Sequence, residues 1–336
     1  MAAATRTPGR HLVLVGPTAG GKSAVAMAVA RRRRRAGRAV ELVSCDSMAV
    51  YRGMDVGTAT PPPTDQAEVP HHLLDVVDPD QEFSVQRFVA LVDAALDDVE
   101  SRGADAILVG GTGLYVQAVT DGLDLPGRYP EVAEELDAEP TDELRERLEA
   151  LDPVAAARVP PGNRRRLVRA LEVTIGSGRP FSASGPGLGS YPATPFVLTG
   201  LHLDRDDLTE RIRERLDEQL RDGFLDEVRA LPAHPEGLSR TAAEALGYRE
   251  LRAHLRGELT LDEAVELAAV RTRRFAVRQE RWFRRDSRIR WFDVAPGAHD
   301  VDATAAAVDS WWAELAAAGT GSTTTVVPGG PAGPPP

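Results

Sequence analysis

The sequence predicts an α/β fold in which a parallel sheet is flanked by helices and interrupted by a helical insertion domain. Strand-like and helix-like segments alternate over residues 11–124 and again over 196–315, as in a sheet with helical crossovers. Residues 125–195 form short helical stretches broken by prolines, which predicts a separate insertion. Residues 316–336 are almost entirely small residues, threonine and proline, so we expect a disordered tail.

Alternating apolar runs define the elements of the core. The expected strands are residues 12–15, 40–44, 106–109 and 197–203, and the expected helices are 23–34, 84–100, 206–220 and 262–285. The third helix carries leucine or isoleucine at four-residue steps, and either Asp206 or Asp207 can cap its first turn.

A phosphate-binding loop follows the first strand. Residues 16–23 read Gly-Pro-Thr-Ala-Gly-Gly-Lys-Ser, the full G-x-x-x-x-G-K-S spacing between a strand and a helix. In such a loop, backbone N–H groups hold a di- or triphosphate such as that of ATP, Lys22 reaches the terminal phosphates, and the Ser23 hydroxyl ligates Mg²⁺. Lys22 is the single lysine among 40 basic residues, which indicates a position needing a slim ammonium. The sheet is therefore expected to be P-loop NTPase-like.

Two further strand ends bear on the chemistry. Asp46 follows the second strand, at the sheet edge where ligands bind, and could ligate magnesium, orient a water or accept a proton. A turn or helix-cap aspartate is the alternative for this residue. The strand at 106–109 runs into Gly110-Gly111-Thr112 without the acidic residue that most nucleoside triphosphatases place there. This sequence is thus poorly equipped for triphosphate hydrolysis, although the glycines could also form a plain turn.

Composition limits the class of protein. The chain has 336 residues, a net charge of −11 and no apolar run near the roughly 18 residues that a membrane helix needs. Residues 1–10 contain no apolar signal-peptide stretch, and one cysteine, Cys45, excludes an internal disulfide, so we expect a cytoplasmic protein.

The chain contains local clusters of basic residues although its net charge is negative. Residues 271–290 contain nine arginines and two acids, and their spacing puts an arginine stripe on one helix face, where we favour contact with nucleic-acid phosphates over a solvated surface. We expect Ala268, Phe275 and Trp282 on the opposite, core-facing side. Arg164–Arg166 with Arg169 make a second patch, whereas Arg31–Arg35 are expected to be solvated surface. The His71-His72 pair has no nearby cysteine, and we expect a structural or cleft-lining role without a transition metal.

Six ordered motifs together closely resemble the bacterial tRNA dimethylallyltransferases, also called tRNA isopentenyltransferases. The resemblance covers residues 11 to about 293, and any one motif alone would be weak. The motifs are residues 16–23, Asp46 to Ala59, Pro70 to Asp75, Gly110 to Tyr115, Arg169 to Glu172 and Leu246 to Glu250.

The resemblance implies prenyl transfer to tRNA. Dimethylallyl diphosphate would place its diphosphate on the loop, and the N6 amine of the adenosine 3′ to the anticodon would attack the allylic carbon. Asp46 would be the general base, while Lys22, the loop amides and Mg²⁺ on Ser23 would stabilise the departing diphosphate. The diphosphate-binding residues would be Gly16, Pro17, Thr18, Ala19, Gly20, Gly21, Lys22 and Ser23. Carried over by position, the tRNA-binding residues would be Asp46, Ser47, Met48, Ala49, Thr112, Arg165, Arg166, Leu167, Val168, Arg169, Glu244, Ala245, Leu246, Gly247, Tyr248 and Arg249.

The sequence departs from the family at a few positions near these tRNA contacts. Ala49 stands where glutamine is frequent, Ala133 where an arginine is expected, and Gly162-Asn163 where Asn-Asp is usual, a pair that can still cap a helix. We expect activity with altered tRNA affinity, a tRNA-binding role for the insertion, and a monomer.

Three rivals remain beside this interpretation. An adenylate isopentenyltransferase shares the loop and the aspartate but needs no second domain. A P-loop small-molecule kinase would use ATP on the same loop. A non-catalytic RNA-binding protein is disfavoured by the intact Lys22, Ser23 and Asp46.

Overall fold

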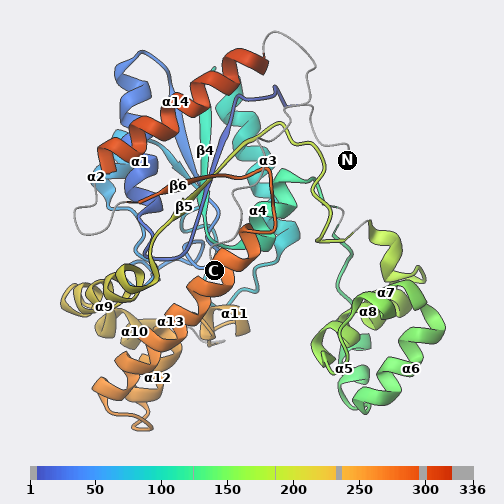
Figure 1. Cartoon of the computed structure of the whole chain (residues 1–336). Coiled ribbons are helices and arrows are strands. Elements are labelled where there is room, and N and C mark those ends of the chain that lie inside the picture. Colours follow the sequence, from blue (N-terminus) through green and yellow to red (C-terminus); the bar gives the residue numbers. More distant parts are fainter. Residues whose placement is uncertain (1–5, 124, 186, 232–236, 295–300, 320–336) are drawn as a thin grey trace. The chain divides into compact units, whose positions relative to one another are not determined.

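The protein is described from a computed structural model, which covers residues 6–123, 125–185, 187–231, 237–294 and 301–319. Six parallel strands form one sheet in the order β3-β2-β4-β1-β5-β6 (Figure 1). The strands are β1 Leu12–Val15, β2 Val40–Ser44, β3 His71–His72, β4 Asp105–Gly110, β5 Val197–His202 and β6 Arg290–Asp293. All four strands expected from the sequence are present, and β3 and β6 extend the sheet at its two edges.

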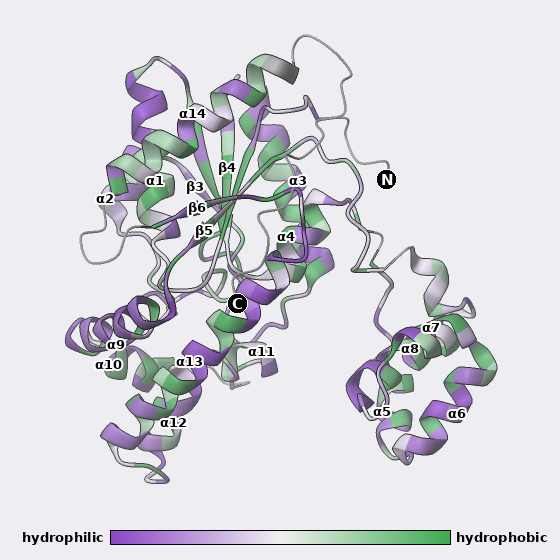
Figure 2. Cartoon of the chain, in the orientation of Figure 1, coloured by the Kyte–Doolittle hydropathy of each residue, from purple (hydrophilic) through white to green (hydrophobic). Residues whose placement is uncertain are grey.

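The central strands are apolar on both faces because helices cover both. Val13 and Val15 of β1 join one buried cluster with α3 (Val85–Ser101) and α4 (Gly113–Thr120). Leu12 and Leu14 point the other way, into a cluster with α1 (Lys22–Arg35) and α14 (Val301–Gly319). Figure 2 shows the hydrophobic green on the central strands around β4, whereas the edge strand β6 is largely purple. A continuous apolar run is what a parallel strand buried on both faces requires.

Helices α1 and α14 lie side by side over one face (Figure 1). Trp312 of α14 is fully buried, and the Arg33 guanidinium stacks 3.3 Å from its ring centroid. Arg33 also bonds Asp309 at 2.7 Å, so the expectation that Arg31–Arg35 are all solvated is wrong for Arg33. The expected boundary between core and tail at residues 315 and 316 is likewise wrong, because α14 continues to Gly319. The rest of the expected tail, residues 320–336, lies outside the described residues.

Helical elements that follow β5 form the remainder of the core. They are α9 Arg205–Arg221, α10 Phe224–Ala230, α11 Arg240–Ala243, α12 Tyr248–Leu255 and α13 Leu261–Phe283, with the short α2 Pro63–Glu68 before β3. The N-cap of α9 is Asp204, whose side chain accepts from the Asp206 amide at 2.9 Å. The expected caps Asp206 and Asp207 therefore lie inside the first turn, where acidic residues complement the helix dipole.

The chain folds into two compact units, of which one is Asp121–Pro192. This unit contains α5 Pro130–Asp137, α6 Thr141–Leu151, α7 Pro153–Arg158, α8 Arg164–Ser177 and the 3₁₀ turn Phe181–Ser184. It has an apolar core of its own, in which Leu144, Leu148 and Leu167 are completely buried. None of the helices in the described part of the chain has the length and apolarity of a bilayer-spanning segment.

Candidate active site

The phosphate-binding loop joins β1 to α1 through a strained turn. Gly16, Ala19 and Gly21 have positive φ angles of 153°, 59° and 82°. A Cβ on Gly16 would stand 2.9 Å from the Leu201 carbonyl oxygen, so glycine is required there by contact as well as by conformation. The loop ends at the first turn of α1, whose amides at Lys22 and Ser23 have no intrahelical acceptor. Those free N–H groups and the positive end of the helix dipole make an anion site.

Lys22 is a desolvated cation in this loop. Its Nζ donates to the Pro17 carbonyl at 2.6 Å. Burial lowers the pKa of Lys22 to about 8, against the favourable effect of the Asp46 carboxylate and with a further lowering by the Arg215 guanidinium. An incoming anion would relieve both the desolvation and the repulsion between the two cations.

Arg215, on α9, is a second cation of the site, half-buried, and the sequence patterns did not predict it. Burial lowers the pKa of Arg215, and Asp46 opposes that shift. Its guanidinium donates to the Thr58 carbonyl at 3.1 Å, which leaves further donors of the fork for a ligand. The available signal was its place directly before Leu216, at the edge of the apolar stripe of α9.

A clasp fixes the loop that orients Arg215. The Glu227 carboxylate of α10 accepts the amides of Asp55, Val56 and Gly57 at 2.8, 2.7 and 3.1 Å. The Tyr248 hydroxyl donates to the same carboxylate at 2.6 Å. Burial and this carboxylate raise the pKa of Tyr248, so it remains a neutral donor. The Thr58 carbonyl is thereby held in place for Arg215.

Asp46 lies two residues after the end of β2, and its carboxylate acts electrostatically on both Lys22 and Arg215. Its Oδ1 accepts the Met48 amide at 2.8 Å, which fixes the orientation of the carboxylate. The Thr112 hydroxyl lies 3.4 Å from both the amide and the hydroxyl of Ser47. The strand ends of β2 and β4 therefore meet at one edge, as the parallel topology requires.

A cavity of about 1530 Å³ collects most of the expected site residues. Its wall includes the loop from Thr18 to Ser23, the segment from Asp46 to Ala49, and Thr112. Glu244, Ala245, Leu246 and Tyr248 also line it, together with Arg215 and Gln279, neither of which was expected from the sequence. Arg165, Arg166, Leu167, Val168 and Arg169 belong to the other compact unit, where the Leu167 side chain is fully buried.

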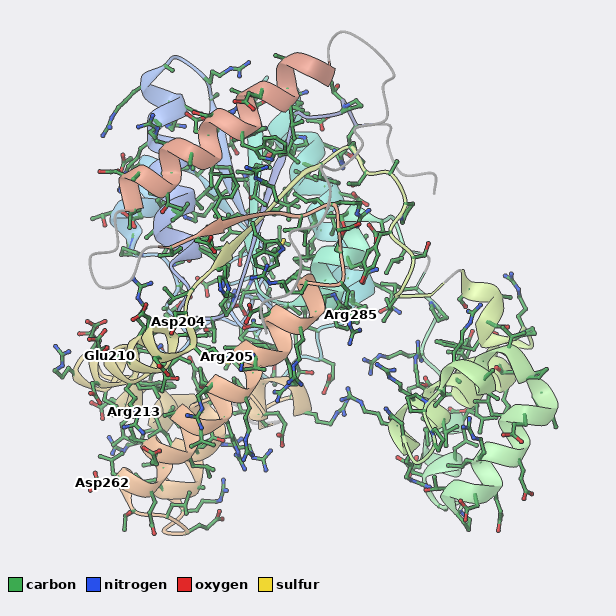
Figure 3. All side chains as sticks on the ribbon, in the orientation of Figure 1. Asp204, Arg205, Glu210, Arg213, Asp262 and Arg285 are labelled. Atoms are coloured by element: carbon green, nitrogen blue, oxygen red, sulfur yellow. The ribbon has the colours of Figure 1, made fainter. Side chains whose placement is uncertain are left out.

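The arginine stripe of α13 is exposed over most of its length. Arg274, Arg278, Arg281 and Arg285 face solvent, while Arg271 pairs with the buried Glu250. Figure 3 places Asp262 near the beginning of α13 and Arg285 just past its end. It also shows the charged, exposed side chains of Arg205, Glu210 and Arg213 on α9 and of its N-cap Asp204.

The expected core-facing side of α13 is partly wrong. Ala268 is buried, and the half-buried Trp282 packs against the core cluster, as expected. Phe275 is also half-buried but belongs to neither core cluster. Arg278 lies over the Phe275 ring at 5.7 Å and Arg285 over the Trp282 ring at 5.9 Å, so both rings border the arginine stripe. The face that packs inward consists of Ala264, Ala268, Ala269, Ala276, Gln279 and Phe283.

The second basic patch divides into anchoring and exposed arginines. Arg164 donates to carbonyls near the end of α5, and Arg169 pairs with Glu172 at 2.8 Å. Arg165 and Arg166 are exposed. Asn163 accepts the Arg166 amide at 3.2 Å, which confirms that the Gly162-Asn163 pair can cap the helix.

The adjacent histidines make separate contacts. His71 bonds the Val69 carbonyl at 2.7 Å and lines the cavity, and His72 bonds Glu41 at 2.7 Å. Among the described residues, no group of three or more His, Cys, Asp or Glu side chains could hold a metal ion.

Comparisons with known proteins agree with this geometry. The family model for IPP transferase matches residues 49–286. The tRNA dimethylallyltransferase of Kineococcus radiotolerans is 47% identical over 296 residues, which cover 87% of this chain and 93% of that protein. The tRNA dimethylallyltransferase of Bifidobacterium longum is 44% identical, with 85% and 87% covered. The crystal structure of the full-length tRNA isopentenylpyrophosphate transferase from Bacillus halodurans superposes with a TM-score of 0.67 at 35% identity, covering 93% of this chain and 98% of that one. The chain belongs to the IPP transferase family.

Proposed function

We propose that this chain transfers a dimethylallyl group from dimethylallyl diphosphate to the N6 amine of the adenosine 3′ to the anticodon of tRNA. The observation that carries the proposal is the meeting of Asp46, Lys22 and Arg215 at one cavity that the phosphate-binding loop also lines. This arrangement supplies one carboxylate for a proton and two cations for a diphosphate leaving group.

In the proposed reaction the adenine nitrogen forms a bond to the allylic C1 carbon as the bond from C1 to the diphosphate oxygen breaks. The electron pair of the broken bond leaves with the diphosphate, whose charge Lys22, Arg215 and the first-turn amides of α1 stabilise. The proton of the amine passes to Asp46, which its bond from the Met48 amide keeps oriented. The loop thus holds a leaving group, and no hydrolytic water is needed.

Mg²⁺ fits the donor set. Ser23 offers a hydroxyl at the start of α1, and no carboxylate cage surrounds it among the described residues. Mg²⁺ commonly binds through few protein oxygens together with substrate phosphates and waters. Ser23 would hold the ion, which when bound supplies positive charge to the diphosphate.

The exposed arginines support an RNA, and not a free nucleotide, as the acceptor of the dimethylallyl group. Arg274, Arg278 and Arg281 on α13, and Arg165 and Arg166 on α8, offer more phosphate contacts than a free nucleotide needs. The flipped adenine of a tRNA loop would enter the cavity, because chemistry at N6 requires an unstacked base. We propose that the protein is a monomer and works in the cytoplasm. Analytical ultracentrifugation tests the oligomeric state.

Labelled substrates test the proposal. The protein is incubated with labelled dimethylallyl diphosphate and either unmodified tRNA or AMP, and separately with γ-labelled ATP. We expect label in tRNA and none in AMP. Label in AMP alone would identify an adenylate isopentenyltransferase, and phosphate transfer from ATP would identify a kinase.

A further inference from the structure

Gln279 is a polar side chain on the buried face of α13. It is 6% exposed and shares that face with Ala276 and Phe283. A buried amide costs free energy unless its donor and acceptor both find partners, so the residues it bonds reveal what it is for.

Both ends of the amide are bonded, to two different loops of the site. The Oε1 atom accepts the Thr18 amide at 2.8 Å, and the Nε2 group donates to the Gly111 carbonyl at 3.0 Å. Thr18 lies in the phosphate-binding loop, and Gly111 lies between β4 and α4. One side chain therefore ties together three segments that are far apart in the sequence.

The second bond leads toward the proposed base. Gly111 precedes Thr112, whose hydroxyl lies 3.4 Å from the amide and hydroxyl of Ser47, and Ser47 follows Asp46. Gln279 is thus bonded directly to the diphosphate side of the cavity and, through Thr112 and Ser47, to the side that would hold the adenine amine.

We propose that Gln279 is a positioning residue that holds the phosphate-binding loop and the Gly110–Thr112 loop in fixed register, so that the diphosphate and the general base are correctly spaced. The proposal rests on the proposed prenyl transfer. Because the Thr18 amide is already engaged, the diphosphate is bound by the remaining part of the loop, by Lys22 and by Arg215. Gln279 touches no reacting atom and acts through the two loops.

Three substitutions test the Gln279 clasp, by which we mean the two bonds from the Gln279 amide to Thr18 and Gly111. Gln279→Met keeps the length and loses both bonds. Gln279→Glu keeps the acceptor for Thr18 but, when ionised, cannot donate to the Gly111 carbonyl. Gly111→Ala attacks the clasp from the other side, since its Cβ would stand 2.2 Å from the Gln279 Nε2 atom. Gln66→Met is the matched control, because it removes a side-chain amide bond to the Pro61 carbonyl outside the clasp.

Steady-state kinetics with dimethylallyl diphosphate and tRNA provide the first measurement. We expect Gln279→Met and Gly111→Ala to lower kcat/KM for the donor between about 10- and 100-fold, the loss that small misplacements of reacting groups cause. The tRNA dissociation constant should change less than about twofold, and Gln66→Met should resemble the wild type in both. A kcat/KM within about twofold of the wild type in Gln279→Met would overturn the proposal.

A pH profile separates positioning from general stability. A protonated glutamic acid has the shape and the donor of glutamine, and burial raises the pKa of such a carboxyl. The activity of Gln279→Glu relative to the wild type should therefore rise as the pH falls from about 8.5 to about 5.5, while the Gln66→Met ratio stays flat. A ratio for Gln279→Glu that stays flat and well below one refutes the clasp even if Gln279→Met fails to fold, because a protonated glutamic acid should restore activity. An inactive wild type would instead refute the proposed function itself.

Discussion

Lys22 gives the sharpest test of the diphosphate site, because its charge changes within an accessible pH range. Burial lowers the pKa of Lys22 to about 8 in the ligand-free protein. With that pKa, about 90% of the side chain is the ammonium at pH 7 and about 10% at pH 9. Only the ammonium attracts an anion, so binding above pH 8 takes up a proton and the affinity falls as the pH rises. The expected weakening between pH 7 and pH 9 is about tenfold.

Calorimetric titration with inorganic pyrophosphate across this range measures the effect. Pyrophosphate itself loses protons at high pH, and Lys22→Met supplies that background because it retains the length of the side chain without its charge. The wild-type dissociation constant, divided by that of Lys22→Met, should rise about tenfold from pH 7 to pH 9. Parallel pH profiles for the two proteins would show that the Lys22 ammonium does not bind the anion. Lys22→Arg should remove the pH dependence and still bind poorly, because a planar guanidinium does not fit where Nζ lies 2.6 Å from the Pro17 carbonyl.

Three other substitutions test the remaining parts of the site and the core. Asp46→Asn should reduce transfer by about 10²- to 10⁴-fold while tRNA still binds in a filter assay, and near-normal turnover would exclude Asp46 as the base. Arg215→Gln should lower kcat by about 10²- to 10³-fold, because it removes a positive charge that stabilises the departing diphosphate. An effect confined to tRNA binding would show that Arg215 does not act on the leaving group. Trp312→Ala should lower the free energy of unfolding by about 3–5 kcal/mol in urea titrations, because it empties a fully buried site and leaves Arg33 without its stacking partner; a loss below about 1 kcal/mol would contradict that packing.

The sheet was predictable because its signals are local. A strand buried on both faces is a short apolar run, and a phosphate-binding loop has fixed spacing, so β1, β2, β4 and β5 could be placed from the sequence alone. The two-residue β3 and the polar edge strand β6 carry no such run. They are strands because a neighbouring strand offers them hydrogen bonds, and that partner is not visible in their own residues.

The missed site residues are polar side chains on helix faces that pack inward. By residue type alone, Arg215 and Gln279 look like ordinary surface residues. Arg215 directly precedes the buried Leu216 of α9, and Gln279 lies on the buried face of α13. The expectation that Ala268, Phe275 and Trp282 pack on the core held for Ala268 and Trp282, but their placement opposite the arginines was wrong for a geometric reason. Seven-residue steps trace one stripe along a helix, but the stripe through Phe275 and Trp282 lies beside the arginines and not opposite them.

The absence of an acidic residue at the end of β4 has a steric cause. That cause helps to explain why the phosphate-binding loop would hold a leaving group and not a phosphate to be hydrolysed. A Cβ on Gly110 would stand 2.3 Å from the Cys45 carbonyl oxygen, and one on Gly111 would stand 2.2 Å from the Gln279 amide. No acidic side chain fits at either position without displacing the segment that carries Asp46 or the clasp that holds the phosphate-binding loop. The close approach that brings the carboxylate of Asp46 to the loop therefore removes the position where a hydrolase keeps its magnesium-binding acid. Gly110→Asp should accordingly disrupt the site without creating nucleoside triphosphatase activity, since its side chain must displace the backbone at Cys45.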